Sequence, residues 1–267
     1  MAYTPQTWVD NNASYPLSAA RMNTIESGIQ SAASVADQGH RILTTTQRDA
    51  LTGVTAGTMI YNTTAQQMQI YIGTGWVPIG GSLVFTNEAA RDAAITSPSE
   101  GMEAYLTAPT VPAATGSITA VPTGVKTIYN GSVWVCVTEI GARSETATTT
   151  TQTSYSTTLA DGSTALSVTL VTGTSALVSL AFTVATNGYV MRMAAAVSGA
   201  STIAASDGKA ILHQDLSNAA AVNGQHGTTF VFTGLTAGTN TFTAQYKMTG
   251  GTGSFNDGRS ITVKGIA

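Results

Sequence analysis

The chain has 267 residues, of which 43% are hydrophobic and only 9% are charged, and its formal net charge is −3. Ordinary soluble domains carry about 25% charged residues, so this chain must stay soluble through the hydroxyl and amide groups of Thr, Ser, Asn and Gln. The near-neutral charge excludes the basic surface that nucleic-acid binding needs, and the apolar runs are far shorter than the roughly 20 residues of a membrane-spanning helix.

Residues 1–43 are predicted to form an attachment segment that contains one helix. The first ten residues lack a basic stretch followed by an apolar run, so we expect synthesis in a cytoplasm without secretion. Ser18 is a candidate N-cap for the helix. Apolar residues then recur at spacings of 3, 4, 3 and 4, as in a short coiled coil: Met22, Ile25, Ile29, Ala32 and Ala36. These residues are predicted to mediate oligomerisation, the alternative being a helix that packs on its own chain.

Residues 44–82 and 83–144 are predicted to be two shaft modules related by an internal repeat. Each has an Arg-Asp-Ala step, which predicts a short helical turn, and each ends in Tyr-x-Gly-x-x-Trp after β-type runs. The second copy has a longer middle, residues 107–125, whose Pro, Thr and Ala predict a loop. A meander of about 35 residues buries too little to be stable alone, so each module needs neighbours. The predicted shaft core is Tyr61, Tyr71, Trp76, Tyr105, Tyr129 and Trp134.

Residues 145–267 are predicted to form a C-terminal β-sandwich head. They begin with a Thr run over 146–153, which we interpret as a polar linker. About eight short β-type runs follow, separated by pairs that suit turns because Gly, Asn and Asp tolerate positive φ. These pairs fall at 161–162, 187–188, 207–208, 223–224, 250–251 and 257–258. Eight strands in roughly 120 residues fit a sandwich or jelly roll.

The sequence offers no constellation that predicts catalysis, a cofactor site or a metal site. No two of its three histidines have the spacing of metal ligands, and the Asp residues that precede Gly are interpreted as turn formers. His213 and Asp215 share one face of a predicted strand, which we interpret as a surface strand end before a turn at Ser217. Cys136 lies in an alternating apolar run and is interpreted as a structural thiol.

Three stretches resemble parts of tailed-bacteriophage tail fibres and minor tail proteins. The N-terminal stretch has Trp8, then Pro-Leu-Ser-Ala-Ala-Arg-Met-Asn over residues 16–23; the second covers residues 47–80 with Tyr-Ile-Gly-Thr-Gly-Trp at 71–76; the third covers residues 234–263. Together they span about half of the chain, and each is a soft pattern. The resemblance implies a homotrimer with an N-terminal attachment region, a slender shaft and a terminal head.

The expected fold is therefore mainly β, with a short N-terminal coiled-coil helix, small β-meander modules and a jelly-roll-like sandwich head in an intertwined homotrimer. Trp and Tyr side chains of the modules would lie at packing positions, because a large aromatic side chain dominates a small core. Contacts with a receptor would lie in turns of the head, since binding residues concentrate on loops. The candidate receptor residues are Asn223, His226, Phe255, Asp257 and Arg259.

The expected function is that of a non-enzymatic virion protein on the surface of the phage particle. It would be a trimeric tail fibre, spike or tail-tip appendage that mediates attachment to the host cell surface. Its partners would be further copies of itself, other virion proteins through residues 1–16, and a glycan or protein of the host surface. One alternative is a head fibre, capsid decoration or collar protein without receptor activity. Another is a polysaccharide depolymerase, which would need two carboxylates about 5 to 9.5 Å apart beside a sugar groove.

Overall fold

The computed structural model describes residues 19–37, 41–64, 67–79, 83–215 and 222–267. The chain is mainly β, with 50% of residues in strands and 12% in helices. It divides into two compact units, Met1–Leu83 and Val84–Ala267, which are considered one at a time below. The attachment residues 1–16 and the candidate N-cap Ser18 lie outside the described residues.

The first element is helix α1 (Ala19–Asp37), as the apolar spacing predicts. Small polar residues are accommodated because the hydroxyls of Thr24 and Ser27 donate to carbonyls one turn earlier, those of Ala20 and Asn23. Ile25 and Ile29 expose 48% and 44% of their surface, and Met22 is half-buried. The side chains at Ala32 and Ala36 lie outside the described part. The described apolar stripe is thus largely left uncovered by its own chain.

Module 1 is a four-stranded sheet with a short helix on one face. Its strands are β1 (Arg41–Leu43), β2 (Met59–Asn62), β3 (Gln67–Tyr71) and β4 (Trp76–Pro78), in that spatial order. The meander β2–β3–β4 was expected, whereas the edge strand β1, which runs parallel to β2, was not. Helix α2 (Thr45–Asp49) starts at a capping box in which Thr44 and Gln47 bond each other reciprocally.

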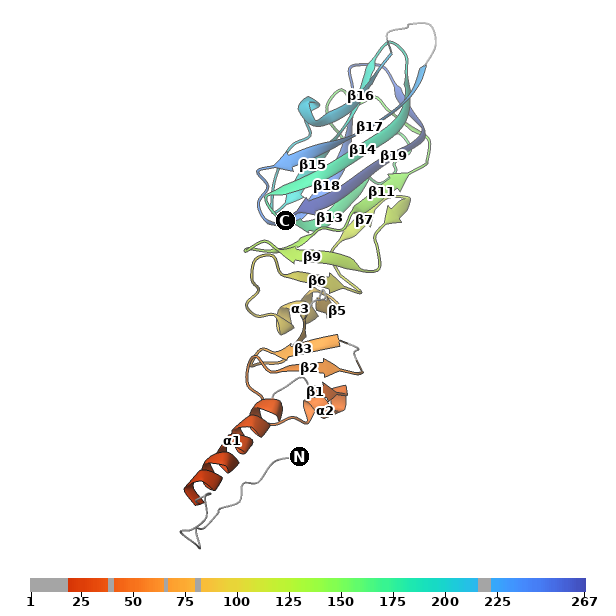
Figure 1. The fold of residues 1–267 in the computed structure, drawn as a ribbon. Helices are drawn as coiled ribbons and strands as arrows, with labels where there is room; N and C mark the ends of the chain where they lie inside the picture. The colour runs from red at the N-terminus through yellow and green to blue at the C-terminus, as the bar shows by residue number, and fades with distance from the viewer. Residues whose placement is uncertain (1–18, 38–40, 65–66, 80–82, 216–221) are drawn as a thin grey trace. The chain divides into compact units, whose positions relative to one another are not determined.

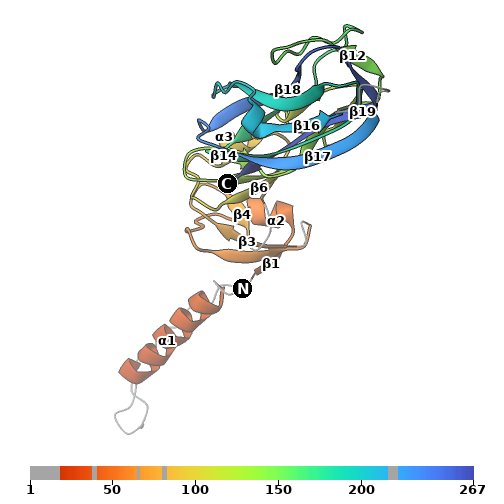
Figure 2. The same ribbon diagram turned by 90° about the horizontal axis from the view of Figure 1, so that it is seen from above.

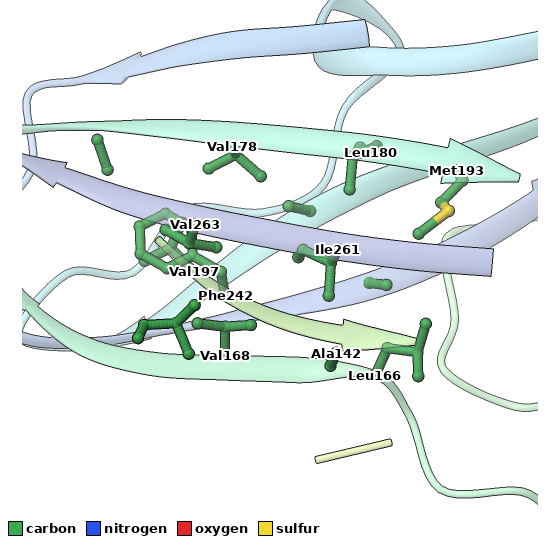
Figure 3. Packing of buried hydrophobic residues seen from close by; sticks show 14 of the residues in the cluster. Ala142, Leu166, Val168, Val178, Leu180, Met193, Val197, Phe242, Ile261 and Val263 are labelled. Atoms are coloured by element: carbon green, nitrogen blue, oxygen red, sulfur yellow. The ribbon is translucent and has the colours of Figure 1, made fainter. Parts of the chain in front are cut away.

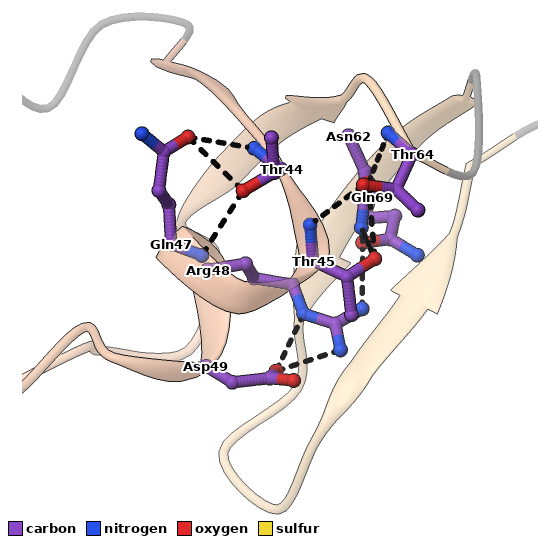
Figure 4. A network of polar contacts seen from close by, with 8 residues as sticks. All are labelled: Thr44, Thr45, Gln47, Arg48, Asp49, Asn62, Thr64 and Gln69. Atoms are coloured by element: carbon purple, nitrogen blue, oxygen red, sulfur yellow. Dashed lines mark hydrogen bonds and ion pairs between the residues drawn. The ribbon is translucent and has the colours of Figure 1, made fainter.

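The core of module 1 under α2 is polar (Figure 4). Asn62 and Gln69 are buried, and the Nδ2 of Asn62 donates to Oε1 of Gln69 at 3.1 Å. Arg48 donates from Nη1 to the same Oε1 at 3.0 Å and contacts Asp49 through an ion pair of 2.6 Å. This network fixes α2 on the sheet, because buried polar groups are retained only when they are hydrogen-bonded.

Module 2 repeats the same topology with β5 (Leu83–Phe85), α3 (Glu88–Ala94), β6 (Glu103–Leu106), β9 (Val125–Tyr129) and β10 (Trp134–Cys136). Corresponding backbone bonds recur in both copies. The Gly57 N–H donates to Tyr71 and the Gly101 N–H to Tyr129, each at 2.8 Å. Gly57 and Gly101 both have positive φ, 94° and 83°, a conformation that favours glycine. The internal repeat read from the sequence is therefore present in the structure.

The predicted loop at 107–125 is a correction, because it contains two strands, β7 (Ala113–Thr115) and β8 (Ile118–Ala120). β7 pairs with β13 (Ser167–Thr172) and β8 pairs with β11 (Ile140–Ser144), so the insertion extends both sheets of the head. The Thr run was also wrongly read as a linker. Its β12 (Thr148–Thr150) pairs with β19 (Gly253–Ile266), and both Thr148 and Thr150 are buried. Backbone pairing with distant strands overrides the loop-like composition.

The head consists of two sheets (Figures 1 and 2). One has the order β17-β14-β19-β11-β8, with β12 also paired to β19; the other has the order β16-β15-β18-β13-β7. In Figure 2, β16 of the second sheet lies beside β17 of the first. The bounds are β11 (Ile140–Ser144), β13 (Ser167–Thr172), β14 (Ser175–Thr186), β15 (Val190–Gly199), η1 (Asp207–Lys209), β16 (Ala210–Gln214), β17 (Val222–Thr233), β18 (Gly238–Met248) and β19 (Gly253–Ile266).

The core lies between these two sheets and is filled by alternate residues of each strand (Figure 3). β14 alternates half-buried and buried positions over nearly its whole length, as a strand with one face on a core does. Val178 and Leu180 from β14 face Val197 and Phe242 from the other sheet. β11, assigned from sequence to module 2, is a strand of this head, and its Ile140 and Ala142 belong to the same core. A β-sandwich-like head thus begins within the predicted second module.

Of the six pairs assigned to turns, three lie between strands and have a glycine at positive φ, at 161–162, 187–188 and 250–251. The pair at 207–208 lies in the 3-10 helix η1, and the remaining two lie inside strands. Gly188 and Gly251 adopt positive φ in the connections β14–β15 and β18–β19, as predicted. The pairs at 223–224 and 257–258 are instead internal to β17 and β19, so their assignment to turns is wrong. Gly258 lies where the β14–β19 register shifts between Thr183 and Val184, so its pair marks a bulge within a long strand.

Candidate functional site: one end of the head

Four of the five candidate receptor residues are brought to one end of the six-stranded sheet. His226 of β17 and Arg259 of β19 both pair with Phe182 of the intervening β14, forming one row across three strands. Asn256 of the bulge donates from Nδ2 to Oδ1 of Asn223 at 2.5 Å. The candidates therefore lie close together, although they come from strands and not from loops. The side chain of Asp257, the fifth candidate, lies outside the described part.

Phe255 and Arg259 are wrongly assigned as receptor contacts. Phe255 is fully buried and Arg259 is only 1% exposed. β19 pairs with β14 on one side and with β11 and β12 on the other, so its side chains alternate between the core and the outer face. This alternation turns both residues inward, where they cannot contact a host surface.

Arg259 is held in the core by aromatic rings and neutral oxygens. Its guanidinium carbon lies 5.3 Å from the ring centroid of Phe255 and 5.9 Å from that of Tyr246. Its Nη1 donates to the carbonyl of Thr146 at 3.1 Å, and its Nη2 donates to the hydroxyl of Ser163 at 2.9 Å. These bonds tie the segments that precede and follow β12 to β19. Burial raises the pKa of Tyr246 to about 12, so that its ring stays neutral beside the cation.

A pair of histidines joins the two sheets at their edge strands. Nδ1 of His213, from β16, lies 3.0 Å from Nε2 of His226, from β17. His213 and Asp215 are both buried, which corrects their interpretation as a surface strand end. Burial and the neighbouring His213 ring lower the pKa of His226, because both disfavour its charged form. Gly224 makes the pair fit, since a Cβ there would lie too close to both rings.

The outer face of the same sheet carries a pocket of about 210 Å³. Paired residues line it in register, Gln225 with Thr183 on one row and Ala181 with Ser260 on the next. Arg143 extends the second row and forms an ion pair of 3.1 Å with Glu145. An amide, two hydroxyls and a guanidinium can donate and accept hydrogen bonds, which suits the hydroxyl and carboxylate groups of a ligand. A second depression of about 200 Å³ lies along the same strands, lined by Glu139, Leu177, Ser179, Thr229, Thr262, Val263 and Lys264.

Sequence reasoning missed these pocket residues because it placed binding groups in turns. Gln225 lies two positions from Asn223 and His226 lies one position further, so the candidate segment was found but its outward face was not. The period-two alternation of a strand predicts which residues share a face, but the sequence alone does not tell which strands pair. Arg143 and Ser260, about 120 residues apart in the chain, are neighbours only because β11 pairs with β19.

The six predicted shaft-core residues comprise two packed aromatic pairs and two exposed tyrosines. The ring centroids of Tyr71 and Trp76 are 5.4 Å apart, and the ring planes meet at 55°. The ring centroids of Tyr129 and Trp134 are 5.5 Å apart, with an angle of 56°. The same tilted aromatic pair is thus present in both modules. Tyr61 and Tyr105 are exposed by 36% and 40%, so their assignment to the module core is wrong. They lie on the outward face of β2 and β6, where alternation directs them away from the helix side.

Among the described residues, no group of three or more His, Cys, Asp or Glu side chains could hold a metal ion. No helix of that part of the chain is long and apolar enough to cross a membrane. Cys136 is buried, and desolvation raises the pKa of its thiol to about 11. No protein-family model matches the chain, and no curated protein is significantly similar to it.

Proposed function

We propose that this chain is a structural protein of a tailed-phage particle that assembles as a homotrimer and presents its head to the host cell surface. The observation that carries the proposal is the uncovered apolar stripe of α1, where Ile25 and Ile29 remain largely exposed. Ile at both core positions of a heptad favours three or four strands over two. The resemblance to tail fibres and minor tail proteins supplies the three-fold state and the phage context.

The mass of the purified full-length protein in solution tests the assembly. Three copies of the 27.3 kDa chain have a mass of 81.9 kDa, and we expect light scattering to give that value. Replacing Ile25 and Ile29 together by Ser should lower the mass or weaken the association, because it removes apolar area from the stripe. The matched control replaces Thr24 and Ser27 by Ala and should leave the mass unchanged. A wild-type mass of 27.3 kDa would contradict the trimer.

Host attachment is proposed for the pocket of the head that contains Gln225, Thr183 and Arg143. Its hydrogen-bonding groups suit a polar surface molecule such as a glycan, which is bound through hydroxyl groups. Purified protein added to host cells before the phage should compete for the receptor and reduce adsorption. The pair Gln225→Ala and Thr183→Ala should lose this competition, whereas Leu212→Ala, on the other sheet, should keep it. Full adsorption in the presence of excess wild-type protein would instead favour a capsid decoration.

A further inference from the structure

One face of module 1 is apolar across all four strands. α2 covers the opposite face, where Asn62 and Gln69 lie buried. On the uncovered face, Ile42 pairs with Tyr61 and Tyr61 with a residue of β3, and a second row runs through β2, β3 and β4. The members of this face, called the A face below, are Ile42, Met59, Tyr61, Met68, Ile70 and Val77. Ile42, Met59 and Tyr61 are 70%, 38% and 36% exposed, and the other three are half-buried, so the chain leaves much of the face open.

Module 2 has a corresponding face in which two methionines are replaced by charged residues. The equivalent backbone bonds Thr63 to Leu43 and Thr107 to Phe85 align the two copies along β2 and β6. Val84 and Tyr105 then occupy the positions of Ile42 and Tyr61, and they are 62% and 40% exposed. The members of this B face that are at least partly exposed are Val84, Glu103, Tyr105, Lys126 and Ile128, whereas Val135 in the same row is buried beside Gly173 and Gly265. Glu103 and Lys126 stand where the A face has Met59 and Met68.

The two substitutions between the faces are coupled. Nζ of Lys126 lies 2.7 Å from Oε1 of Glu103, and both side chains remain more than 40% exposed. A methionine pair on one face has thus been replaced by an ion pair on the other, while the exposed tyrosine is kept at the same position. Apolar and aromatic side chains with few charges are typical of the centre of a protein interface. A repeated open face within one chain points to further copies of that chain as the occupant.

Matching chemistry decides which faces can meet. An A face packed on a B face would place Glu103 and Lys126 against methionines, which removes water from the ion pair without giving it new partners. An A face on an A face buries apolar side chains only. Around a symmetry axis, B faces bring Glu103 of one copy towards Lys126 of the next, so they are complementary in charge. Contacts between unlike faces are therefore disfavoured by the cost of desolvating the charges.

We propose that the A face binds the A faces of other copies, that the B face binds B faces, and that the exchange of Met59 and Met68 for Glu103 and Lys126 keeps the chains in register. The inference rests on the self-association proposed above, and it adds which surfaces of the modules are in contact and how the chains are aligned. Tyr61 and Tyr105 are suitable positions for probes of the A face and the B face, because they have similar exposure and lie at equivalent positions.

Disulfide cross-linking of full-length chains tests the alignment. Tyr61→Cys and Tyr105→Cys are each expected to give a cross-linked dimer of chains on a non-reducing gel, because like faces meet. In a mixture of the two variants carrying tags of different length, the 61–105 product should be absent. Wild-type protein is the control, because its only cysteine, Cys136, is buried. A 61–105 product as abundant as the like pairs would overturn the proposed register.

Absence of cross-links separates the two proposals. If both variants keep a mass of 81.9 kDa but do not cross-link, the chains associate elsewhere and the faces are not the interface. If the wild type has a mass of 27.3 kDa, the proposed trimer fails as well.

Charge variants test the coupled exchange. Met59→Glu alone should weaken association, because it places one unpaired charge in the A face. Met59→Glu together with Met68→Lys copies the B face and should restore association, and it should now permit the 61–105 cross-link. Leu212→Glu is the matched control, since Leu212 is an apolar residue of the head with 47% exposure. Equal masses for Met59→Glu and wild type at all concentrations would overturn the A face as an interface.

Discussion

At the scale of single residues, the histidine pair gives the head a dependence on pH. His213 and His226 meet between the edge strands of the two sheets, next to a glycine that leaves them room. A neutral pair shares one N–H between two ring nitrogens, whereas two charged rings repel. The folded head therefore holds His226 in its neutral form more strongly than the unfolded chain does.

The lowered pKa of His226 predicts that the head loses stability on acidification. In the unfolded chain, His226 binds a proton as the pH falls through its ordinary pKa of 6.5, whereas in the folded chain it binds a proton only at lower pH. Stability should hold above that value, decline as the pH falls through it, and stop declining from this source below the folded pKa. The midpoint of thermal unfolding at fixed protein concentration measures this decline between about pH 7.5 and about pH 5.5. His226→Asn should flatten it, and a variant profile that matches wild type would contradict the prediction.

At the scale of elements, the two modules are the same small fold with different interiors. Module 1 has the polar network of Asn62, Gln69 and Arg48 beneath its helix. In module 2, Arg91 is the equivalent of Arg48, and its guanidinium carbon lies 4.7 Å from the ring centroid of Trp134. The buried Leu106 occupies the position of Asn62. Trp134 is 8% exposed, whereas Trp76 is only half-buried. The repeat has thus kept its aromatic pair while changing how much of it is covered.

This difference predicts unequal effects of removing the two tryptophans. Trp134→Ala should lower the free energy of unfolding by about 3–5 kcal/mol, the usual cost of deleting a buried large aromatic side chain. Trp76→Ala should cost less, because part of its ring is already in water. Urea unfolding followed by circular dichroism measures both losses, with Trp134→Phe and Trp76→Phe as controls that keep a ring. A larger loss at Trp76 than at Trp134 would contradict the assignment of burial.

The element scale also shows what the sequence could predict. The helix from Ala19, the repeat and most head strands follow from local periodicity and from matching motifs, which are written in consecutive residues. β1 and β5 have only three residues each and owe their strand conformation to their neighbours. The same holds for β7, β8 and β12, whose Thr- and Ala-rich segments are strands because β11, β13 and β19 bind them.

The sequence predicts candidate residues that lie close together in the fold, but it does not predict the faces on which they lie. Asn223 and His226 lie at the end of the head that carries the pocket, whereas Phe255 and Arg259 point into its core. Asn-Gly and Asp-Gly pairs predict turns from local preference, whereas β17 and β19 continue through them because long-range pairing satisfies their backbone groups. A one-residue change in alternation exchanges the inner and outer faces, so orientation depends on a register that only the folded sheet defines.

At the scale of the whole molecule, the scarcity of charge governs how copies can associate. Only 25 of 267 side chains are Lys, Arg, Asp or Glu. Ile25 and Ile29 of α1 and the members of the A face are apolar, and the B face contains the ion pair of Glu103 and Lys126. Association through such surfaces is driven by the removal of apolar area from water, which does not depend on ionic attraction. Exposed ion pairs add at most about 1 kcal/mol and are weakened by salt.

The proposed assembly should therefore persist in concentrated salt. Raising sodium chloride from about 0.1 M to about 1 M shortens the screening length from about 10 Å to about 3 Å, which weakens attraction between exposed charges but leaves apolar contacts intact. We expect light scattering to give 81.9 kDa at both concentrations, with the dilution at which the mass falls unchanged or lower at high salt. Glu103→Gln with Lys126→Gln should behave like wild type at both concentrations. Dissociation at high salt would instead mean that charges such as Glu103 and Lys126, and not the apolar surfaces, hold the copies together.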